Sequence, residues 1–129
     1  MNKKIINATQ IVVDNVKYRS KLESKCAKIL KDNNIPFEYE PFKIQYIKKF
    51  EYKNEKYRAA YYTPDFVIED KYILEIKGFP NDVWRYKKKL ILLKLKEDMN
   101  NKYIFYEIKN EKQLKNWIEN YKNNIYERN

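Results

Sequence analysis

Apolar residues recur at helical spacing in three parts of the chain. The first helix follows Ser20 and ends at Asn33-Asn34, just before Pro36. The second is basic and apolar and runs through "PNDVWRYKKKLILLKLKED", and the third follows Asn110. The apolar faces of the first and third helices comprise Tyr18, Leu22, Cys26, Ile29, Leu30, Leu114, Trp117, Ile118 and Tyr121.

Aromatic and β-branched residues between these helices predict strands. Residues 37–47 and 57–67 form a long hairpin around the polar "KNEK", residues 72–76 form a third strand, and "KYIFYEI" forms a fourth. "QIVVDNVKY" predicts a small hairpin that turns at Asp14-Asn15, because these residue types tolerate the positive φ of a tight turn. We therefore predict an α/β fold with a core order of α-β-β-β-α-β, a small N-terminal hairpin and a C-terminal helix.

Length and composition indicate a single folded domain over residues 1–129. The chain has 43% hydrophobic residues and no repeat, linker or shift in composition that would mark a second domain. No apolar run is long enough to span a membrane, and the first residues lack the apolar core of a secretory signal. We expect a soluble, cytoplasmic protein with no membrane partner and with Cys26 buried as a small apolar residue.

A formal charge of +10 indicates a polyanionic partner such as nucleic acid. An AT-rich genome would also enrich Lys, Asn, Ile and Tyr, so the charge supports this interpretation without deciding it. The residues that we expect to contact DNA phosphates are Arg19, Lys21, Arg85, Lys87, Lys88 and Lys89. The alternative is that each of them lies on a solvated helix face.

Missing residue types exclude several kinds of chemistry. The chain has no histidine, so it has no histidine general base, no Cys/His zinc site and no Ser-His-Asp triad. Its one glycine, Gly78, excludes a glycine-rich phosphate loop. Carboxylates, lysines and a hard metal ion remain.

The stretch "YYTPDFVIEDKYILEIKG", residues 61–78, concentrates such groups. If residues 69–71 form a turn, Phe66 lies opposite Leu74, and Asp65 lies nearly opposite Glu75. Glu75 and Lys77 then share a face, whereas Tyr72, Leu74 and Ile76 point into the core. Paired carboxylates destabilise a sheet unless a cation such as Mg²⁺ lies between them. Lys77 can then hold a phosphate or the attacking water, and Gly78 permits a sharp turn.

Glu-x-Lys alone is weak evidence, because it occurs four more times in the chain. The rival version, Glu107-Ile-Lys109, is also preceded by an acid, Asp98, but this acid lies in a polar turn and no glycine follows Lys109. We therefore favour the stretch at 61–78, with a solvated sheet edge as the alternative.

The combined motifs resemble known nucleases. "TPDF" followed by "EIK" is similar to the PD-(D/E)XK motif of metal-dependent nucleases, whose common core has the predicted element order. More specifically, "YRSKLESKCAKILKDNNIPFEYEPFKIQYI" followed by "YTPDF" and "LEIKG" resembles the phage endonuclease I family, which resolves branched DNA such as Holliday junctions. A second, uncharacterised phage family of nuclease-like proteins is similar over a longer stretch that includes "WRYKKKL".

The resemblance assigns roles to four residues. It implies that Glu23 is an acid carried on the first helix, that Asp65 and Glu75 are metal ligands, and that Lys77 is the catalytic lysine. For Glu23 the alternative is a capping box with Ser20, in which the glutamate only bonds back to the helix N-terminus. In that family two subunits also exchange segments at the link between "FEYE" and "YTPDF", which is longer here.

The resulting interpretation is a Mg²⁺-dependent endodeoxyribonuclease of phage or mobile-element origin that acts on branched DNA as a homodimer. We expect Asp65, Glu75 and the Ile76 carbonyl to bind the metal, with Glu23 as a further candidate ligand and Mn²⁺ able to replace Mg²⁺. The first alternative is a restriction-like or transposon-end nuclease that cuts linear duplex. The second is a non-catalytic, basic nucleic-acid-binding module with a nuclease fold.

Overall fold

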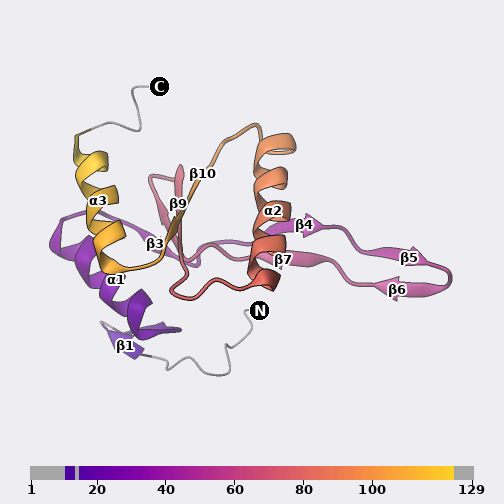
Figure 1. Cartoon of the computed structure of the whole chain (residues 1–129), viewed down its shortest axis with the longest axis horizontal. Helices are drawn as coiled ribbons and strands as arrows, with labels where there is room; N and C mark the ends of the chain where they lie inside the picture. Colours follow the sequence, from indigo (N-terminus) through magenta and orange to yellow (C-terminus); the bar gives the residue numbers. More distant parts are fainter. Residues whose placement is uncertain (1–10, 14, 124–129) are drawn as a thin grey trace. The chain divides into compact units, whose positions relative to one another are not determined.

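The computed structural model describes residues 11–13 and 15–123, with side chains from residue 15 onward (Figure 1). The three predicted helices are confirmed as α1 (Lys21–Asp32), α2 (Asp82–Glu97) and α3 (Glu111–Lys122). Each helix begins at a polar cap whose side-chain oxygen accepts a bond from a backbone N–H in the first turn; the caps are Ser20, Asn81 and Asn110. These local signals explain why the helix starts could be predicted from sequence.

A mixed four-stranded sheet has the strand order β10-β9-β8-β3. Its strands are β3 (Glu38–Tyr39), β8 (Phe66–Ile68), β9 (Tyr72–Ile76) and β10 (Ile104–Ile108). The pairs β3–β8 and β8–β9 are antiparallel. Backbone N–H groups of Ile104 and Lys77 donate to the carbonyls of Lys71 and Ile108, each at 2.9 Å, so β9 and β10 advance in the same direction. Helix α2 makes the crossover that a parallel pair needs, which confirms the α/β class and the element order.

The predicted long hairpin is confirmed, and its strands continue closer to the turn than the sequence predicted. After β3 the chain forms β4 (Ile44–Ile47), which pairs with β7 (Ala60–Tyr62). It then forms β5 (Phe50–Tyr52) and β6 (Glu55–Tyr57). The two-residue turn between these strands consists of Lys53 and Asn54, with φ of 49° and 67°. Only the first half of "KNEK" is therefore a turn, because Glu55 and Lys56 belong to β6.

Two features interrupt the hairpin. Pro64, between β7 and β8, has no N–H to donate to a ladder, and the strand changes its partner there from β4 to β3. In β4 one extra residue, Tyr46, lies between the pairs Gln45↔Tyr61 and Ile47↔Ala60. Such a bulge bends a strand and increases its twist.

The predicted turns are also present. The first hairpin pairs β1 (Ile11–Val13) with β2 (Val16–Tyr18), and Asn15 has a φ of 65°, whereas Asp14 lies outside the described residues. Between β8 and β9, Glu69 and Asp70 have positive φ, and the Lys71 N–H donates to the Ile68 carbonyl at 3.1 Å. Phe66 lies opposite Leu74, as the sequence predicted.

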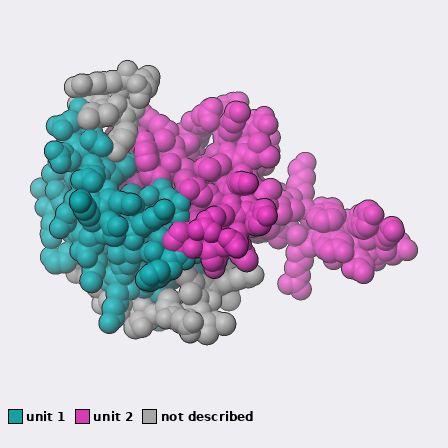
Figure 2. Space-filling model, in the orientation of Figure 1, with its two compact units in different colours: residues 1–37, 76–79, 107–129 teal, residues 38–75, 80–106 magenta. Residues whose placement is uncertain are grey.

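The chain forms two compact units, which are coloured separately in Figure 2. Unit 1 comprises Met1–Phe37, Ile76–Phe79 and Glu107–Asn129, and unit 2 comprises Glu38–Glu75 and Pro80–Tyr106. The chain passes from unit 2 to unit 1 within β9, between Glu75 and Ile76.

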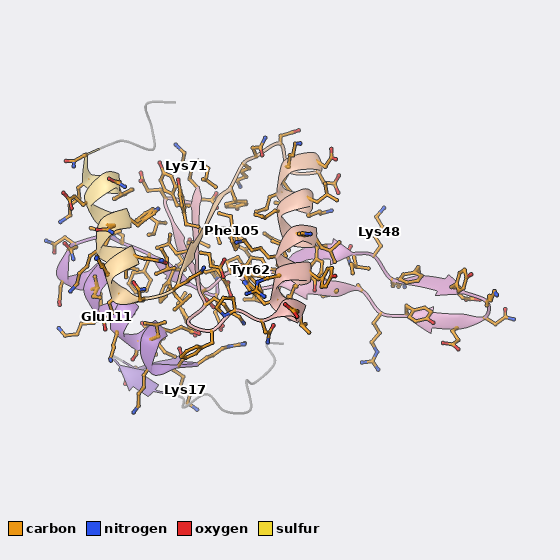
Figure 3. All side chains as sticks on the ribbon, in the orientation of Figure 1. Lys17, Lys48, Tyr62, Lys71, Phe105 and Glu111 are labelled. Atoms are coloured by element: carbon orange, nitrogen blue, oxygen red, sulfur yellow. The ribbon has the colours of Figure 1, made fainter. Side chains whose placement is uncertain are left out.

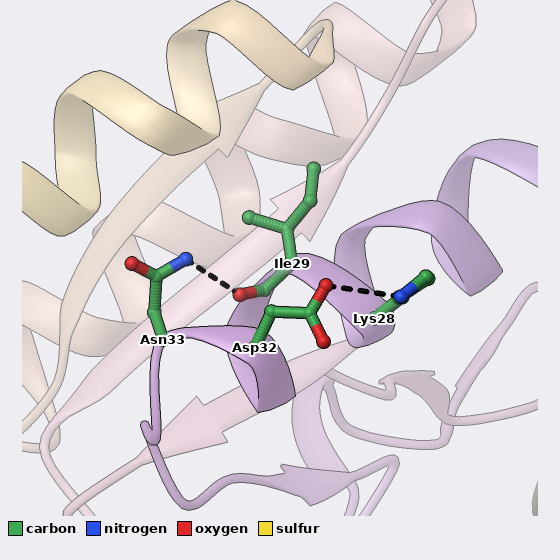
Figure 4. A network of polar contacts seen from close by, with 4 residues as sticks. All are labelled: Lys28, Ile29, Asp32 and Asn33. Carbon is green, nitrogen blue, oxygen red and sulfur yellow. Dashed lines mark hydrogen bonds and ion pairs between the residues drawn. The ribbon is translucent and has the colours of Figure 1, made fainter.

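In unit 1, helices α1 and α3 pack together. Cys26 is fully buried on α1, as expected. At the C-terminal end of α1 the Asn33 side chain donates to the Ile29 carbonyl at 2.8 Å, and Lys28 pairs with Asp32 at 3.0 Å (Figure 4). Lys122 of α3 donates to the side-chain oxygen of Asn33 at 3.1 Å. Side-chain hydrogen bonds and an ion pair therefore stabilise the C-terminal end of α1.

In unit 2, one apolar cluster joins α2 to the sheet and to the β4–β7 pair. Its buried members are Ile44, Tyr62, Val67, Ile73, Trp84, Ile91, Leu95 and Tyr103. Ile73 lies in this cluster although the sequence analysis placed only Tyr72, Leu74 and Ile76 in the core. All five residues of β9 are buried. The face of the sheet that carries Glu75 is therefore a covered face and not a solvated edge.

Candidate active site

Three acidic residues are buried in the described part of the chain, and all three belong to the predicted site. Glu23 is 4% exposed, Asp65 7% and Glu75 8%, and no other charged residue among 15–123 is buried. The acids of the rival motif differ, since Glu107 is half-buried and Asp98 is exposed and paired with Lys94 at 3.0 Å. Burial therefore distinguishes the acids of residues 61–78 from those of the rival motif.

Unit 2 carries Asp65 and Glu75 on one face of the sheet. The register Val67↔Ile73 and Phe66↔Leu74, continued by one residue beyond β8, places Asp65 across from Glu75. By the period of two along a strand, both acids share a face of the sheet with Val67 and Ile73, two members of the apolar cluster that includes residues of α2. The backbone around Asp65 is also tied to β3, because its carbonyl accepts a bond from the Glu40 N–H at 2.9 Å. Two carboxylates thus lie where an apolar layer ends.

Tyr62 is a further member of this group that sequence reasoning missed. Its hydroxyl donates to Oε1 of Glu75 at 2.6 Å, and both side chains are buried. The length is that of a short, well-formed hydrogen bond between oxygens. The ring of Tyr62 packs near Phe105, with 6.2 Å between ring centroids (Figure 3). The only signal in the sequence was the position of Tyr62 three residues before Asp65, which does not predict a contact with Glu75.

Unit 1 carries Ile76, Lys77 and Glu23. The Lys77 N–H bonds to Ile108, so the segment after Glu75 continues the strand, and the Lys77 side chain is half-buried. The chain bends at Gly78, but the φ of Gly78 is not positive, so the bend does not require glycine. A Cβ at this position would lie 3.5 Å from Leu22 Cδ2, an ordinary contact. The start of α1 therefore packs beside the residue that follows Lys77.

Glu23 lies in the first turn of α1, where Ser20 caps the helix by accepting a bond from the Glu23 N–H at 3.1 Å. This bond is the serine half of the capping box that was the alternative for Glu23. A residue that only caps a helix can remain in solvent, whereas Glu23 is buried. The cap and a role in the site are thus compatible.

The predicted DNA-binding residues on α2 do not form a single stripe. At 100° per residue, Lys87 lies roughly 160° around the helix from Arg85, whereas Lys88 and Lys89 lie on the side of Arg85. Arg85 is exposed and pairs with Asp82 at 2.8 Å, and Lys89 lies 5.9 Å from the ring centroid of Tyr86. Near α1, Arg19 is half-buried and Lys21 is exposed.

Asp65, Glu75 and the Ile76 carbonyl are the groups that fit a hard cation. Among the residues that the structure describes, no set of three or more acidic or cysteine side chains is arranged to hold a metal ion. Mg²⁺ in proteins commonly uses only one or two carboxylates, with water and substrate oxygens as its other ligands. The two buried carboxylates of unit 2, Asp65 and Glu75, are consistent with this ligand chemistry.

A family model described as Phage endonuclease I matches residues 5–124. The chain belongs to the phage endonuclease I family. The match covers both units and all four residues predicted to be catalytic. Membership in the phage endonuclease I family makes the chain an endonuclease with DNA as its partner. The curated proteins and the solved structures contain no significant match. None of the helices in the described part of this phage endonuclease I family member could cross a membrane.

Proposed function

We propose that this member of the phage endonuclease I family is a Mg²⁺-dependent endodeoxyribonuclease that hydrolyses phosphodiester bonds in branched DNA such as Holliday junctions. The observation that carries the proposal is the pair of buried carboxylates, Asp65 and Glu75, on one covered face of the sheet in unit 2. The wider PD-(D/E)XK assignment is part of this proposal.

The physical argument starts from the free energy of burying like charges. A buried carboxylate needs hydrogen-bond donors or an opposite charge, and two carboxylates across a strand pair repel each other. Tyr62 supplies one such donor, to Glu75. A divalent cation would compensate both carboxylates.

Each residue then has a role in the proposed mechanism. Asp65, Glu75 and the Ile76 carbonyl would hold Mg²⁺, and Tyr62 would fix the rotamer of Glu75 through its hydrogen bond. When bound, the metal would polarise the phosphate and promote ionisation of water. The Lys77 ammonium would donate to a phosphate oxygen or to the attacking water, and Glu23 would complete the acidic set.

A cleavage assay tests the proposal. A four-way junction and a linear duplex of matched sequence are incubated with the protein over a titration of Mg²⁺, and again with Mn²⁺ or with EDTA. We expect nicking of the junction that requires Mg²⁺ or Mn²⁺ and stops in EDTA, with the duplex cut more slowly.

The other outcomes separate the alternatives. Equal cleavage of both substrates would indicate a nuclease of linear duplex. Binding of DNA without cleavage at any metal concentration would indicate a non-catalytic module. Full activity in EDTA would contradict metal dependence.

A further inference from the structure

Residues 48–58, which we call the tip hairpin, are exposed without exception. They comprise β5, β6 and the two-residue turn between them, and they continue the β4–β7 pair away from the rest of unit 2 (Figures 1 and 2). Lys48, labelled in Figure 3, marks the base of the tip hairpin. Because no side chain of this segment is buried, it does not contribute to the apolar core.

One face of the tip hairpin carries three aromatic rings beside Glu55. Phe50 lies opposite Tyr57, and Tyr52 shares their face by the period of two. Phe50 and Tyr57 are stacked with 4.9 Å between centroids and an interplanar angle of 12°. They remain 51% and 42% exposed, and Tyr52 is 61% exposed. A cross-strand pair stabilises the hairpin itself, but it leaves much of the three rings uncovered.

The tip hairpin carries a net positive charge. The tip hairpin contains five basic residues, Lys48, Lys49, Lys53, Lys56 and Arg58, against two acidic ones, Glu51 and Glu55. Glu51 lies opposite Lys56 in the register, and Glu55 accepts a bond from the Tyr57 hydroxyl at 3.0 Å. Two copies of this segment would repel each other, whereas a polyanion would be attracted. Charge thus favours nucleic acid over a second copy of the chain.

We propose that the tip hairpin binds the DNA substrate at its branch point, where Phe50 and Tyr57 stack on an unstacked base and the flanking lysines contact phosphates. The inference rests on the proposed function and deepens it, because it names the part of the chain that distinguishes branched DNA from duplex. Aromatic rings bind bases whose faces are exposed, and such faces are available at a branch but not within a continuous duplex.

The register relates the tip hairpin to the acidic pair within unit 2. Phe50↔Tyr57 continues the register of Ile47↔Ala60, and Tyr62, the partner of Glu75, follows Tyr57 five positions later. Five extended residues span at most about 17 Å. This length is short compared with a branched DNA substrate, so a single substrate can contact both the tip hairpin and the acidic pair.

The first experiment measures DNA binding without cleavage, in a Glu75→Gln background. Fluorescence anisotropy gives the affinity for a four-way junction and for a matched duplex, and 2-aminopurine at the branch reports stacking. The Phe50→Ala/Tyr57→Ala variant should lose about tenfold or more in junction affinity, with little change for duplex, and should abolish the change in 2-aminopurine emission.

Three further variants act as controls. Phe50→Trp should preserve both readouts, and Phe50→Leu, which keeps an apolar side chain but no ring, should lose them. Tyr86→Ala removes a ring on α2 that is even more exposed, at 71%, and should have no effect on either readout. Circular dichroism melting curves identify any variant that fails to fold. If the double variant fails to fold, the single variant Phe50→Leu still tests the inference.

Several results would overturn the inference. One is an unchanged junction affinity in folded Phe50→Leu and double variants. Another is an equal loss of affinity for junction and for duplex. The last is that these substitutions convert a dimer to a monomer, as measured by light scattering. The last result would show that a second copy covers the aromatic face. If the Glu75→Gln protein bound no DNA at all, the proposed function itself would fail, whereas tip variants that bind like their parent would contradict only this inference.

Discussion

Glu75 accepts a hydrogen bond from Tyr62 on the same covered sheet face that carries Asp65. At the scale of the residue, its environment combines a donor, an apolar layer and a second carboxylate across the strand pair. These neighbours explain why an acid in a buried position of β9 points to function, since an apolar residue would pack there without such support.

The chemistry is tested by removing one charged group at a time. Asp65→Asn, Glu75→Gln and Lys77→Ala should each abolish Mg²⁺-dependent nicking, because each removes a proposed metal ligand or phosphate donor, while the protein still folds and binds DNA. Nicking of a supercoiled plasmid, together with a melting curve, measures this. Glu107→Gln and Lys109→Ala are the matched controls from the rival motif and should stay within a few-fold of wild type. Inactive but folded controls would identify the rival motif as the site.

Stability without metal gives a second residue-scale prediction. Glu75→Gln removes one of two like charges, so in EDTA its melting temperature should equal or exceed that of the wild type. Tyr62→Phe leaves the buried carboxylate without this donor and should lower the free energy of unfolding by about 1–3 kcal/mol. In the Glu75→Gln background, Tyr62→Phe should lower the free energy of unfolding by a smaller amount. An equal cost in both backgrounds, measured by denaturant unfolding, would show that the hydrogen bond is not the cause.

At the scale of the element, the turn between β8 and β9 is held by a contact with the two residues that precede β10. The Tyr103 hydroxyl donates to Asp70 Oδ1 at 2.8 Å, and Lys102 pairs with Asp70 at 3.2 Å. The bond from Tyr103, and after it the bond from Lys102, lower the pKa of Asp70 below its ordinary value. Because Asp70 and Glu69 both have positive φ, the contact supports a turn that sets the register of Asp65 and Glu75.

A pH dependence of stability follows from this shift. A carboxyl whose pKa is lowered by folding stabilises the protein above its ordinary pKa and loses that contribution as the pH falls through the folded-state value. The difference in melting temperature between wild type and Tyr103→Phe should therefore be present at pH 7 and should shrink below pH 3.8. When Asp70→Asn is added to wild type and to Tyr103→Phe, the difference in melting temperature between the two should no longer depend on pH. A difference that is constant from pH 7 to pH 2 would assign the effect to packing of the ring.

At the scale of the whole molecule, cleavage of a junction requires two matched sites, because a junction is close to two-fold symmetric. We propose that the protein acts as a C₂ homodimer, which supplies two such sites. The net charge of +10 favours approach to DNA.

A heterodimer tests both the dimer and the sharing of sites. One chain carries Glu23→Ala and the other Glu75→Ala. If Glu23 acts with Asp65, Glu75 and Lys77 of the partner chain, one site is wholly wild type and nicking is recovered. If all four act within one chain, both sites are defective and nicking is absent. We expect no recovery, and the measurement is single-strand nicking after the heterodimer has been shown to be present. A monomer at working concentration would contradict the dimer.

Local patterns in the sequence determined the helices, their caps, the two-residue turns and the pairing of Phe66 with Leu74. These features depend on neighbouring residues: a cap such as Ser20 and an Asx turn act within four positions, and strand periodicity determines which side chains share a face. The same periodicity, combined with a turn at residues 69–71, was sufficient to predict that Asp65 and Glu75 lie across from each other. Strand β5 and the first two residues of β6 were missed although Phe50 and Tyr52 favour strands, because the polar "KNEK" suggested a loop.

The tertiary structure alone decided which faces are covered. Tyr62 meets Glu75 because the chain changes its strand partner between β7 and β8, at Pro64. Ile73 is buried because α2 packs over that face of β9. Both contacts join residues that are distant along the chain, so no local pattern specifies them. For the same reason the burial of Glu23, Asp65 and Glu75, which separates these acids from the others, arises only in the folded chain.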